Sequence, residues 1–222
     1  MKLYAIIVAG GSGQRMKSSI PKQFIELSGK PILMRTIEKF YSAKSSINII
    51  LVLPKSHHSV WATLCHKHHF NIPHQVCEGG ISRFQSVKNG LKLCIEESII
   101  AVHDGVRPLV KPDLILNLYK EAESKNAVIP VCPVIESIRK VDGDDSKALD
   151  RSQYYSVQTP QCFSSELLQK AYLQREQLNF TDDASVVEAL GEKVGLFEGE
   201  NTNIKITSPV DLLLAEAILK DS

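Results

Sequence analysis

The sequence has no hydrophobic run long enough to cross a bilayer, no paired cysteines and no marked excess of charge of either sign. Residues 3–9 are apolar, but they run straight into glycines and lack a convincing signal-peptide cleavage region. The 26 lysines and arginines against 25 aspartates and glutamates give a net charge of +1, which argues against a general polyanion-binding surface. We therefore expect a cytoplasmic protein that binds neither a membrane nor nucleic acid.

Metal-binding and disulfide-forming patterns are also missing. The 5 cysteines are dispersed and never form a C-x-x-C pair, so a zinc ribbon or a disulfide framework is disfavoured and reduced thiols are expected. Histidines gather within residues 57–69, but nothing there approaches H-E-x-x-H, which favours a polar helix surface over a zinc site. No G-x-S-x-G occurs, so an α/β-hydrolase is disfavoured.

The chain is large enough for one domain with a substantial core. It has 222 residues, of which 43% are hydrophobic, and we expect a single domain over residues 1–222. Strands are expected at 3–8, 48–53, 74–77, 99–103, 127–132 and 194–198, and helices at 31–44, 57–69, 83–95, 112–125, 165–177, 183–190 and 209–220. This alternation predicts an α/β fold with a mostly parallel, doubly wound sheet.

Three helix starts carry capping signals. Ser82 followed by Gln85 predicts a capping box for the helix at 83–95. Ser208 predicts an N-cap before the last helix, with Pro209 and Asp211 at the first and third helical positions. Thr181 predicts an N-cap followed by acidic residues in the first turn.

Residues 133–158 break the alternation of strands and helices. They read as two extended pieces, 134–141 and 153–158, on either side of a solvated, turn-rich segment at 142–147. An antiparallel arm of this kind would expose apolar side chains unless a second subunit covered them. The apolar residues concerned are Ile135, Ile138, Tyr154 and Tyr155. The alternative is a long active-site loop folded back on its own domain.

A glycine-rich loop follows the first strand directly. Backbone N–H groups around Gly10, Gly11 and Gly13 can converge on an anion. Neither the phosphate-loop pattern nor the dinucleotide pattern fits, because Met16 stands where each needs a glycine. Two cations, Arg15 and Lys22, follow the loop, and together with the backbone donors they suit a triphosphate. The alternatives are a plain strand–helix connector and two solvated surface cations.

The strand at 99–103 runs into His103-Asp104, at the sheet edge where ligands gather in doubly wound folds. Asp104 could hold a magnesium ion or a ribose hydroxyl there. The alternative is that Asp104 caps a turn and pairs with Arg107. The Gly79-Gly80 step would also let the backbone approach a ligand, although it reads equally well as a turn into the next helix.

Seven ordered blocks of this sequence resemble those of the 2-C-methyl-D-erythritol 4-phosphate cytidylyltransferases. The blocks are VAGGSGQRM, IPKQF, EGGISRFQSV, VHDGVRP, VQTPQCF, TDDASVVE and NIKIT-P, which span about residues 3–218. The resemblance implies a Rossmann-like nucleotidyltransferase fold, with helices on both faces of a mostly parallel twisted sheet, and a homodimer joined through a protruding β-arm. It also implies Mg²⁺-dependent transfer of CMP from CTP to a polyol phosphate.

The resemblance also implies roles for individual residues. Arg15 and Lys22 would bind the triphosphate and stabilise the transition state. The backbone of residues 9–13 with the residues around the second glycine pair would hold the nucleotide and read cytosine; these are Ala9, Gly10, Gly11, Gly13, Gly80 and Ser86. Asp104 would contact the ribose or the metal. The polyol phosphate or the nucleotide would be held, in part across the dimer, by Arg107, Ser137, Arg151, Thr159 and Lys205.

Two positions depart from the family pattern. Ile81 stands where the family commonly has an acidic residue beside the base, and Ser137 replaces a common threonine while keeping the hydroxyl. Two further functions remain open at this point. One is a cytidylyltransferase acting on ribitol 5-phosphate, which shares most of these motifs, and the other is a non-catalytic nucleotide-binding module. An NAD-dependent oxidoreductase is disfavoured by Met16.

Overall fold

The fold centres on one mixed, mostly parallel sheet, seen in a computed structural model that describes residues 1–11 and 20–221. Its strands run in the order β10-β7-β11-β6-β1-β4-β5. β10 and β11 pair with successive parts of one edge of β7, and β12 pairs with the opposite edge. The bounds are β1 Lys2–Val8, β4 Asn48–Leu53, β5 Gln75–Glu78, β6 Ser98–Asp104, β7 Ala127–Pro133, β10 Tyr155–Val157, β11 Gln161–Ser164 and β12 Gly195–Glu198. Strands β5, β4, β1 and β6 are parallel neighbours, whereas β11 is antiparallel to both β6 and β7.

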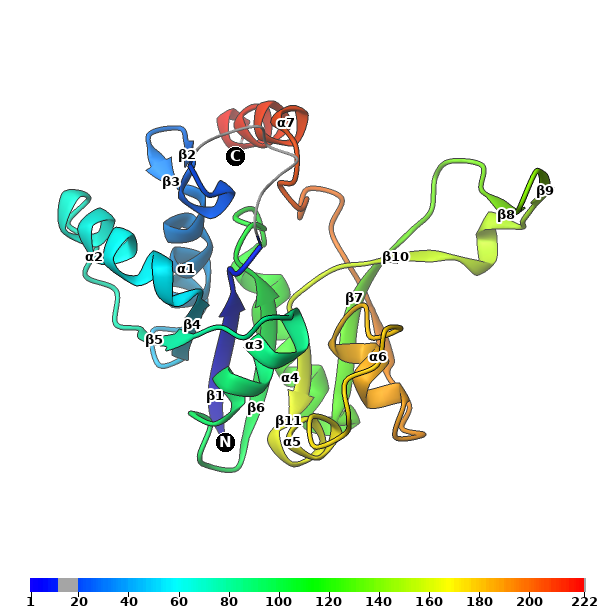
Figure 1. The fold of residues 1–222 in the computed structure, drawn as a ribbon, viewed down its shortest axis with the longest axis horizontal. Coiled ribbons are helices and arrows are strands. Elements are labelled where there is room, and N and C mark those ends of the chain that lie inside the picture. Colours follow the sequence, from blue (N-terminus) through cyan, green and yellow to red (C-terminus); the bar gives the residue numbers. More distant parts are fainter. Residues whose placement is uncertain (12–19, 222) are drawn as a thin grey trace.

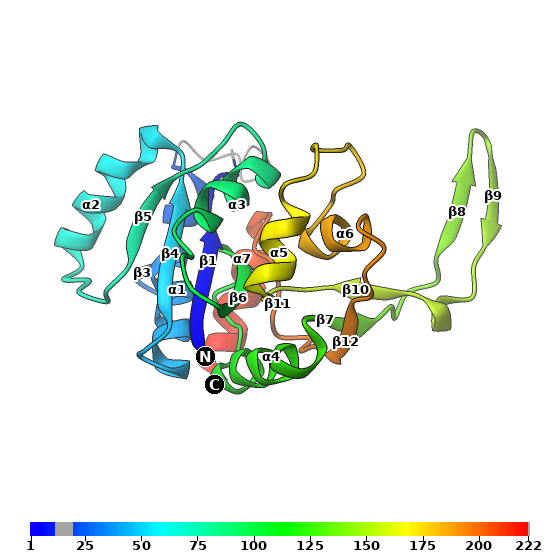
Figure 2. The same ribbon diagram turned by 90° about the horizontal axis from the view of Figure 1, so that it is seen from below.

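Helices cover both faces of the sheet (Figures 1 and 2). They are α1 Ile32–Ala43, α2 His58–Lys67, α3 Arg83–Leu91, α4 Pro112–Lys125, α5 Ser165–Ala171, α6 Asp183–Glu188 and α7 Pro209–Lys220, with 3-10 turns η2 Lys22–Phe24, η3 Lys55–His57 and η4 Arg151–Gln153. A short hairpin joins β2 Glu26–Leu27 to β3 Lys30–Pro31. The expected strands and helices are therefore all present, although α3 and α5 end earlier than their sequence patterns predict.

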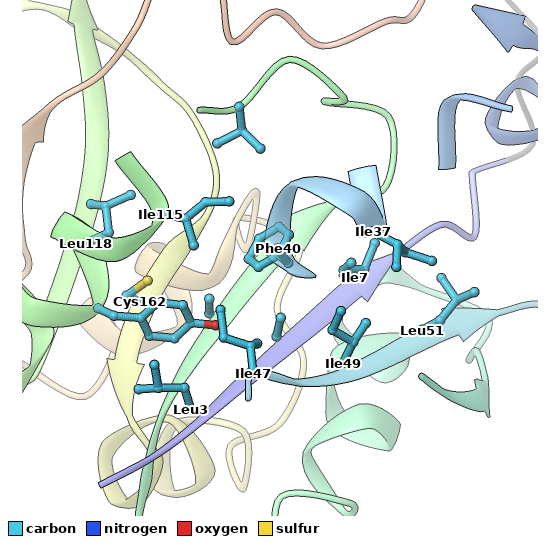
Figure 3. Close-up of a cluster of buried hydrophobic side chains, with 14 of the residues drawn as sticks. Leu3, Ile7, Ile37, Phe40, Ile47, Ile49, Leu51, Ile115, Leu118 and Cys162 are labelled. Carbon is cyan, nitrogen blue, oxygen red and sulfur yellow. The ribbon is translucent and has the colours of Figure 1, made fainter. Parts of the chain in front are cut away.

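Alternate residues of β1 divide the core into two layers. Ala5 and Ile7 pack in a cluster with residues of α1 and α4, and Figure 3 shows Ile7 close to Ile37 and Phe40 in this layer. Tyr4 and Ile6 belong instead to the cluster with α3, α5 and α6. Because side chains alternate along a strand, a continuous apolar run such as this one must be covered on both faces. The two layers thereby hold the carboxyl ends of β1 and β6 in place.

The helix caps bear out one prediction fully and correct two others. Ser208 and Asp211 form the expected capping box of α7, with Pro209 at the first helical position. Ser82 accepts from the Gln85 backbone N–H, but the Gln85 side chain donates to Glu176 instead of reaching back, so the predicted box is only half formed.

The N-cap of α6 is Asp182 and not Thr181 as the sequence predicted. The Asp182 carboxylate accepts from the Ser185 backbone N–H, and the Ser185 hydroxyl accepts from the Asp182 N–H. The reciprocal pair forms from Asp182 because Ser185 stands three residues after it, which is the spacing that a capping box needs.

An arm extends from the sheet between β7 and β10 (Figures 1 and 2). Its outer part is an antiparallel hairpin of β8 Arg139–Asp142 and β9 Asp145–Ala148, all exposed, with Gly143 at φ +59° in the turn. The second extended piece predicted for the arm instead contributes β10, which pairs with β7 in the main sheet. The hairpin stands away from the sheet, so the alternative of a loop folded back on its own domain is wrong. No helix in the described ranges is long and apolar enough to cross a membrane.

Candidate active site

A cavity of about 230 Å³ opens at the carboxyl ends of the parallel strands. Four predicted residues from the first loop and its neighbourhood line it: Ala9, Gly10, Gly11 and Lys22. Four more come from other elements: Gly80, Ser86, Asp104 and Lys205. Residues as far apart in the sequence as Ala9 and Lys205 thus meet at one edge of the sheet, as doubly wound folds arrange for their ligands. Gly13 and Arg15 lie outside the described residues.

A second cavity of about 240 Å³ adjoins the first. Arg107 and Thr159 line it, and it shares Asp104 and Lys205 with the first cavity. Its wall continues directly from the end of β10 through Val157 and Gln158 to Thr159. The structure therefore brings most predicted site residues into two connected hollows.

The two predicted residues of the arm lie apart from both cavities. Ser137 precedes β8 and is exposed, while Arg151 begins η4 and donates to the carbonyl oxygen of Ile135. Neither lines either cavity within the same chain. Within the described part of this chain, these two residues are not members of the site.

The first loop is held by the backbone and by one buried amide. The Ala9 N–H donates to the Val52 carbonyl at 3.0 Å, and Gln23 Nε2 donates to the Ala9 carbonyl at 2.8 Å. Gln23 is buried, and sequence reasoning missed it although it stands inside the P-K-Q-F block. The Lys22 side chain lies against Gly11. A Cβ atom added to Gly11 would be 3.4 Å from Lys22 Cε and 3.7 Å from Lys22 Nζ. The loop and the cation therefore form one surface.

The second glycine pair joins β5 to α3 with almost no free space. A Cβ at Gly80 would come within 2.3 Å of Gln85 Cβ, which no ordinary adjustment of a side chain relieves. The Gly80 N–H donates to Ser86 Oγ at 3.1 Å, and Ser86 Oγ donates to the Ser82 carbonyl at 2.8 Å. Glycine is thus required here for the close approach of the chain to its own helix, which also shapes the cavity wall.

Asp104 is surrounded by cations. Its Oδ2 lies 3.0 Å from Lys205 Nζ and 3.2 Å from Arg107 Nε, so the pairing with Arg107 considered as an alternative is present. Burial opposes ionisation of Asp104, but Lys205, Arg83 and Arg107 outweigh it and hold the carboxyl pKa well below its usual range. Both ion pairs that the described residues make with Asp104 are to Oδ2.

A buried histidine supports Asp104 from behind. The Asp104 N–H donates to Thr159 Oγ1 at 3.0 Å, and Thr159 Oγ1 lies 3.0 Å from His103 Nδ1. His103 Nε2 is 3.2 Å from the Arg107 carbonyl, which can only accept, so we place the proton on Nε2 and the lone pair on Nδ1. Burial lowers the pKa of His103 to about 4, with the Asp104 charge opposing that shift. The ring is therefore neutral at pH 7.

We expect acid to lower the free energy of unfolding through His103. An unfolded histidine takes up its proton near pH 6.5, whereas the folded ring stays neutral down to about pH 4. Between these values the unfolded state binds the extra proton, so stability falls as the pH falls, by on the order of 3 kcal/mol in total. Urea titrations at several pH values between 7 and 4.5 should show a flatter profile for His103→Gln and an unchanged slope for the exposed control His66→Gln. Equal slopes for wild type and His103→Gln would contradict this.

Sequence reasoning missed two charged residues that line the cavities, Arg83 and Asp182. Arg83 lines both cavities, and its guanidinium makes an ion pair with buried Asp183. One sequence signal could have pointed to Arg83. A cation in the first turn of a helix interacts unfavourably with the helix dipole, so an arginine at that position indicates a role other than helix stabilisation.

Comparison with known proteins decides the family. The family model of IspD, 2-C-methyl-D-erythritol 4-phosphate cytidylyltransferase, matches residues 3–221. The chain belongs to this family. It is therefore a nucleotidyltransferase, as the ordered sequence blocks indicated, and the resemblance stated from them is confirmed.

Relatives of this cytidylyltransferase family align along almost the whole chain. The 2-C-methyl-D-erythritol 4-phosphate cytidylyltransferase of Phocaeicola vulgatus is 50% identical over 219 residues, covering 99% of this chain and 100% of that protein. That of Bacillus licheniformis is 39% identical over 223 residues, covering 99% and 96%. The crystal structure of the Thermus thermophilus enzyme superposes with a TM-score of 0.82 at 31% identity, covering 99% and 100%. The expected fold class is confirmed.

Proposed function

We propose that the protein transfers CMP from CTP to 2-C-methyl-D-erythritol 4-phosphate, releasing pyrophosphate and forming CDP-methylerythritol for non-mevalonate isoprenoid precursor synthesis. The observation that carries the proposal is the pair of adjoining cavities that share Asp104 and Lys205. A backbone loop with a lysine suits a triphosphate in the first cavity. In the second, three cations against two carboxylates suit an acceptor phosphate. Relatives with this name align over the full length, whereas nothing favours the ribitol 5-phosphate alternative.

The chemistry needs no dedicated general base, because the acceptor phosphate is already an anionic nucleophile. One of its oxygens attacks the α-phosphorus of CTP in line, and the bond from this phosphorus to the bridging oxygen of the β-phosphate breaks. Pyrophosphate leaves with that oxygen. The protein contributes by holding two anions in contact and by screening their repulsion with Lys22, Arg107 and Lys205, with Arg15 expected to join them.

Magnesium is the proposed metal, and the fit rests on Asp104. The described residues contain no group of three or more His, Cys, Asp or Glu side chains able to hold a metal ion. Mg²⁺ commonly binds through one or two carboxylates together with substrate phosphates and water, and Asp104, which lines the nucleotide cavity, can supply such a carboxylate. When bound, the ion would neutralise charge on the triphosphate and on departing pyrophosphate.

A cytoplasmic homodimer joined through the arm completes the proposal. The arm carries exposed apolar side chains, among them Ile135 at 68% and Val141 at 69% exposure, which a second copy would cover. Ser137 and Arg151 line neither of the two site cavities of their own chain, which supports a role in the site of the partner. A dimer that exchanges arms would bring both residues to the acceptor cavities.

An assay of pyrophosphate release tests the function directly. With each of the four nucleoside triphosphates and each of the two polyol phosphates, we expect turnover with CTP and methylerythritol 4-phosphate, at least roughly 10-fold above every other pair. Chelation with EDTA should abolish the reaction, and added Mg²⁺ should restore it. Faster turnover with ribitol 5-phosphate would contradict the proposed acceptor, and the absence of pyrophosphate with every pair would leave only a binding module.

A further inference from the structure

Three charged residues line both cavities: Asp104, Lys205 and Arg83. The first two were expected from the sequence, whereas Arg83 has no assigned role. It is the first residue of α3, directly after the Ser82 cap at the mouth of the nucleotide cavity. Its position is therefore the border between the space proposed for the nucleotide and the space proposed for the acceptor.

The guanidinium of Arg83 is fixed in place by a fully buried carboxylate. Arg83 Nη1 and Nη2 donate to Asp183 Oδ1 and Oδ2 at 3.0 and 2.6 Å, a bidentate arrangement. The Tyr172 hydroxyl also donates to Asp183 Oδ1, at 2.6 Å. Asp183 has no exposed surface. The fork geometry leaves the guanidinium plane little freedom to rotate.

Asp183 is itself held rigidly at the start of α6. Gln161 Oε1 accepts from the backbone N–H groups of both Asp183 and Ala184, each at 3.0 Å. Gln161 Nε2 donates to the Asp182 carboxylate at 2.9 Å. The chain from β11 through α6 to Arg83 is thus a continuous set of hydrogen bonds. Such support is what a precisely placed ligand contact requires.

Arg83 retains hydrogen-bonding capacity towards the cavities. A guanidinium carries five N–H donors, and within the described residues Arg83 uses only the two that reach Asp183. Its side chain keeps 30% exposure, although its partner has none. The positive charge of Arg83 also contributes to the low pKa of the nearby Asp104 carboxyl. Arg83 therefore has N–H donors left for an anion bound where the two cavities meet.

We propose that Arg83 contacts the α-phosphate of the bound nucleotide and positions it for the acceptor. The inference rests on the proposed function, because the new bond joins the acceptor phosphate to the α-phosphorus. That phosphorus must therefore sit where the two cavities meet, which is where Arg83 lies. The contact would screen the repulsion between the two anions as they approach.

A purely structural role makes a different prediction. The Arg83–Asp183 pair also ties α3 to α6, and removing Arg83 alone would leave a buried charge without a partner, which destabilises a protein strongly. The double variant Arg83→Gln/Asp183→Asn replaces the pair with two amides that can still hydrogen-bond, and so separates the two roles. Arg175→Gln, at an exposed position in the segment between α5 and α6, is the matched control for loss of an arginine.

Equilibrium binding of CMP and of cytidine to wild type and variants gives a readout that needs no turnover. CMP carries the α-phosphate and cytidine does not. For the double variant we expect CMP affinity to fall about 10-fold, cytidine affinity to stay the same, and the urea midpoint to remain near that of wild type. In turnover assays, kcat should fall at least about 10-fold, whereas Arg175→Gln should match wild type in every measurement.

Unchanged CMP affinity in the folded double variant would overturn the proposal and leave only the structural tie. If the double variant unfolds, Arg83→Lys decides, because it keeps the charge but loses the fork. We then expect reduced CMP affinity with retained stability, and wild-type CMP affinity would refute the contact. The two claims can also fail separately. If CMP binding depends on Arg83 but the wild-type protein forms no CDP product, the proposed function is contradicted and the Arg83 contact is supported.

Discussion

Replacing Lys22 with alanine is expected to lower kcat by about two to three orders of magnitude while the protein remains folded. Lys22 lines the nucleotide cavity and lies against Gly11, so its ammonium group is held beside the loop proposed for the triphosphate. Charge on the phosphates grows as pyrophosphate departs, and a fixed cation stabilises that state more than the ground state. CTP affinity should therefore weaken much less than kcat.

Steady-state kinetics with CTP and methylerythritol 4-phosphate would measure this effect, beside a urea titration of the same preparation. Lys44→Ala is the matched control, because Lys44 is an exposed lysine at the end of α1 that lines neither cavity. Its kcat should equal that of wild type. A Lys22→Ala enzyme with wild-type turnover would remove Lys22 from the catalytic machinery.

Mixing two inactive variants is expected to restore activity, if the arm serves the partner subunit. Arg151→Ala removes an arm residue, and Lys22→Ala removes a core residue, so each homodimer should have two defective sites. In a heterodimer that exchanges arms, one site combines the intact core of the Arg151→Ala subunit with the intact arm of the Lys22→Ala subunit. The purified heterodimer, with one intact site of its two, should therefore show about half of wild-type activity.

Co-expression of the two variants with different affinity tags would isolate the heterodimer, and light scattering would give its mass. Co-expression of Lys22→Ala with itself under both tags is the control and should stay inactive. An inactive heterodimer of the correct mass would mean that each arm serves its own subunit. A monomeric mass for the wild type would contradict the proposed dimer itself.

The central strands and two of the helices could be predicted closely from the sequence. β4, α4 and α7 begin and end at the predicted residues, because each has a clear apolar pattern and a proline at its start or directly after its end. The strand β11 was missed, since its four residues begin with buried Gln161 and show no alternation. Its burial depends on β6 and β7 lying on either side, which a local pattern does not encode.

The candidate site, too, contains residues that could be predicted from the sequence and residues that could not. The loop residues and Lys22 stand close together in the chain, so their chemistry is legible from spacing alone. The tie between Arg83 and Asp183 spans 100 positions and appears only when α3 and α6 meet. Gln23 carries no titratable group, and only its burial beside Ala9 identifies it as a support of the first loop. Contacts of this kind are set by tertiary packing rather than by local preference.

The arm is continuous with the wall of the second cavity. β10 pairs with β7 through Val157, and the next residues, Gln158 and Thr159, line that cavity, with Gln158 tied by its N–H to the Pro130 carbonyl at 2.8 Å. In the proposed dimer, a partner that immobilised the arm would also restrain these side chains. Assembly and acceptor affinity would then be thermodynamically linked, so that saturating acceptor would tighten subunit association by the same factor by which association tightens acceptor binding.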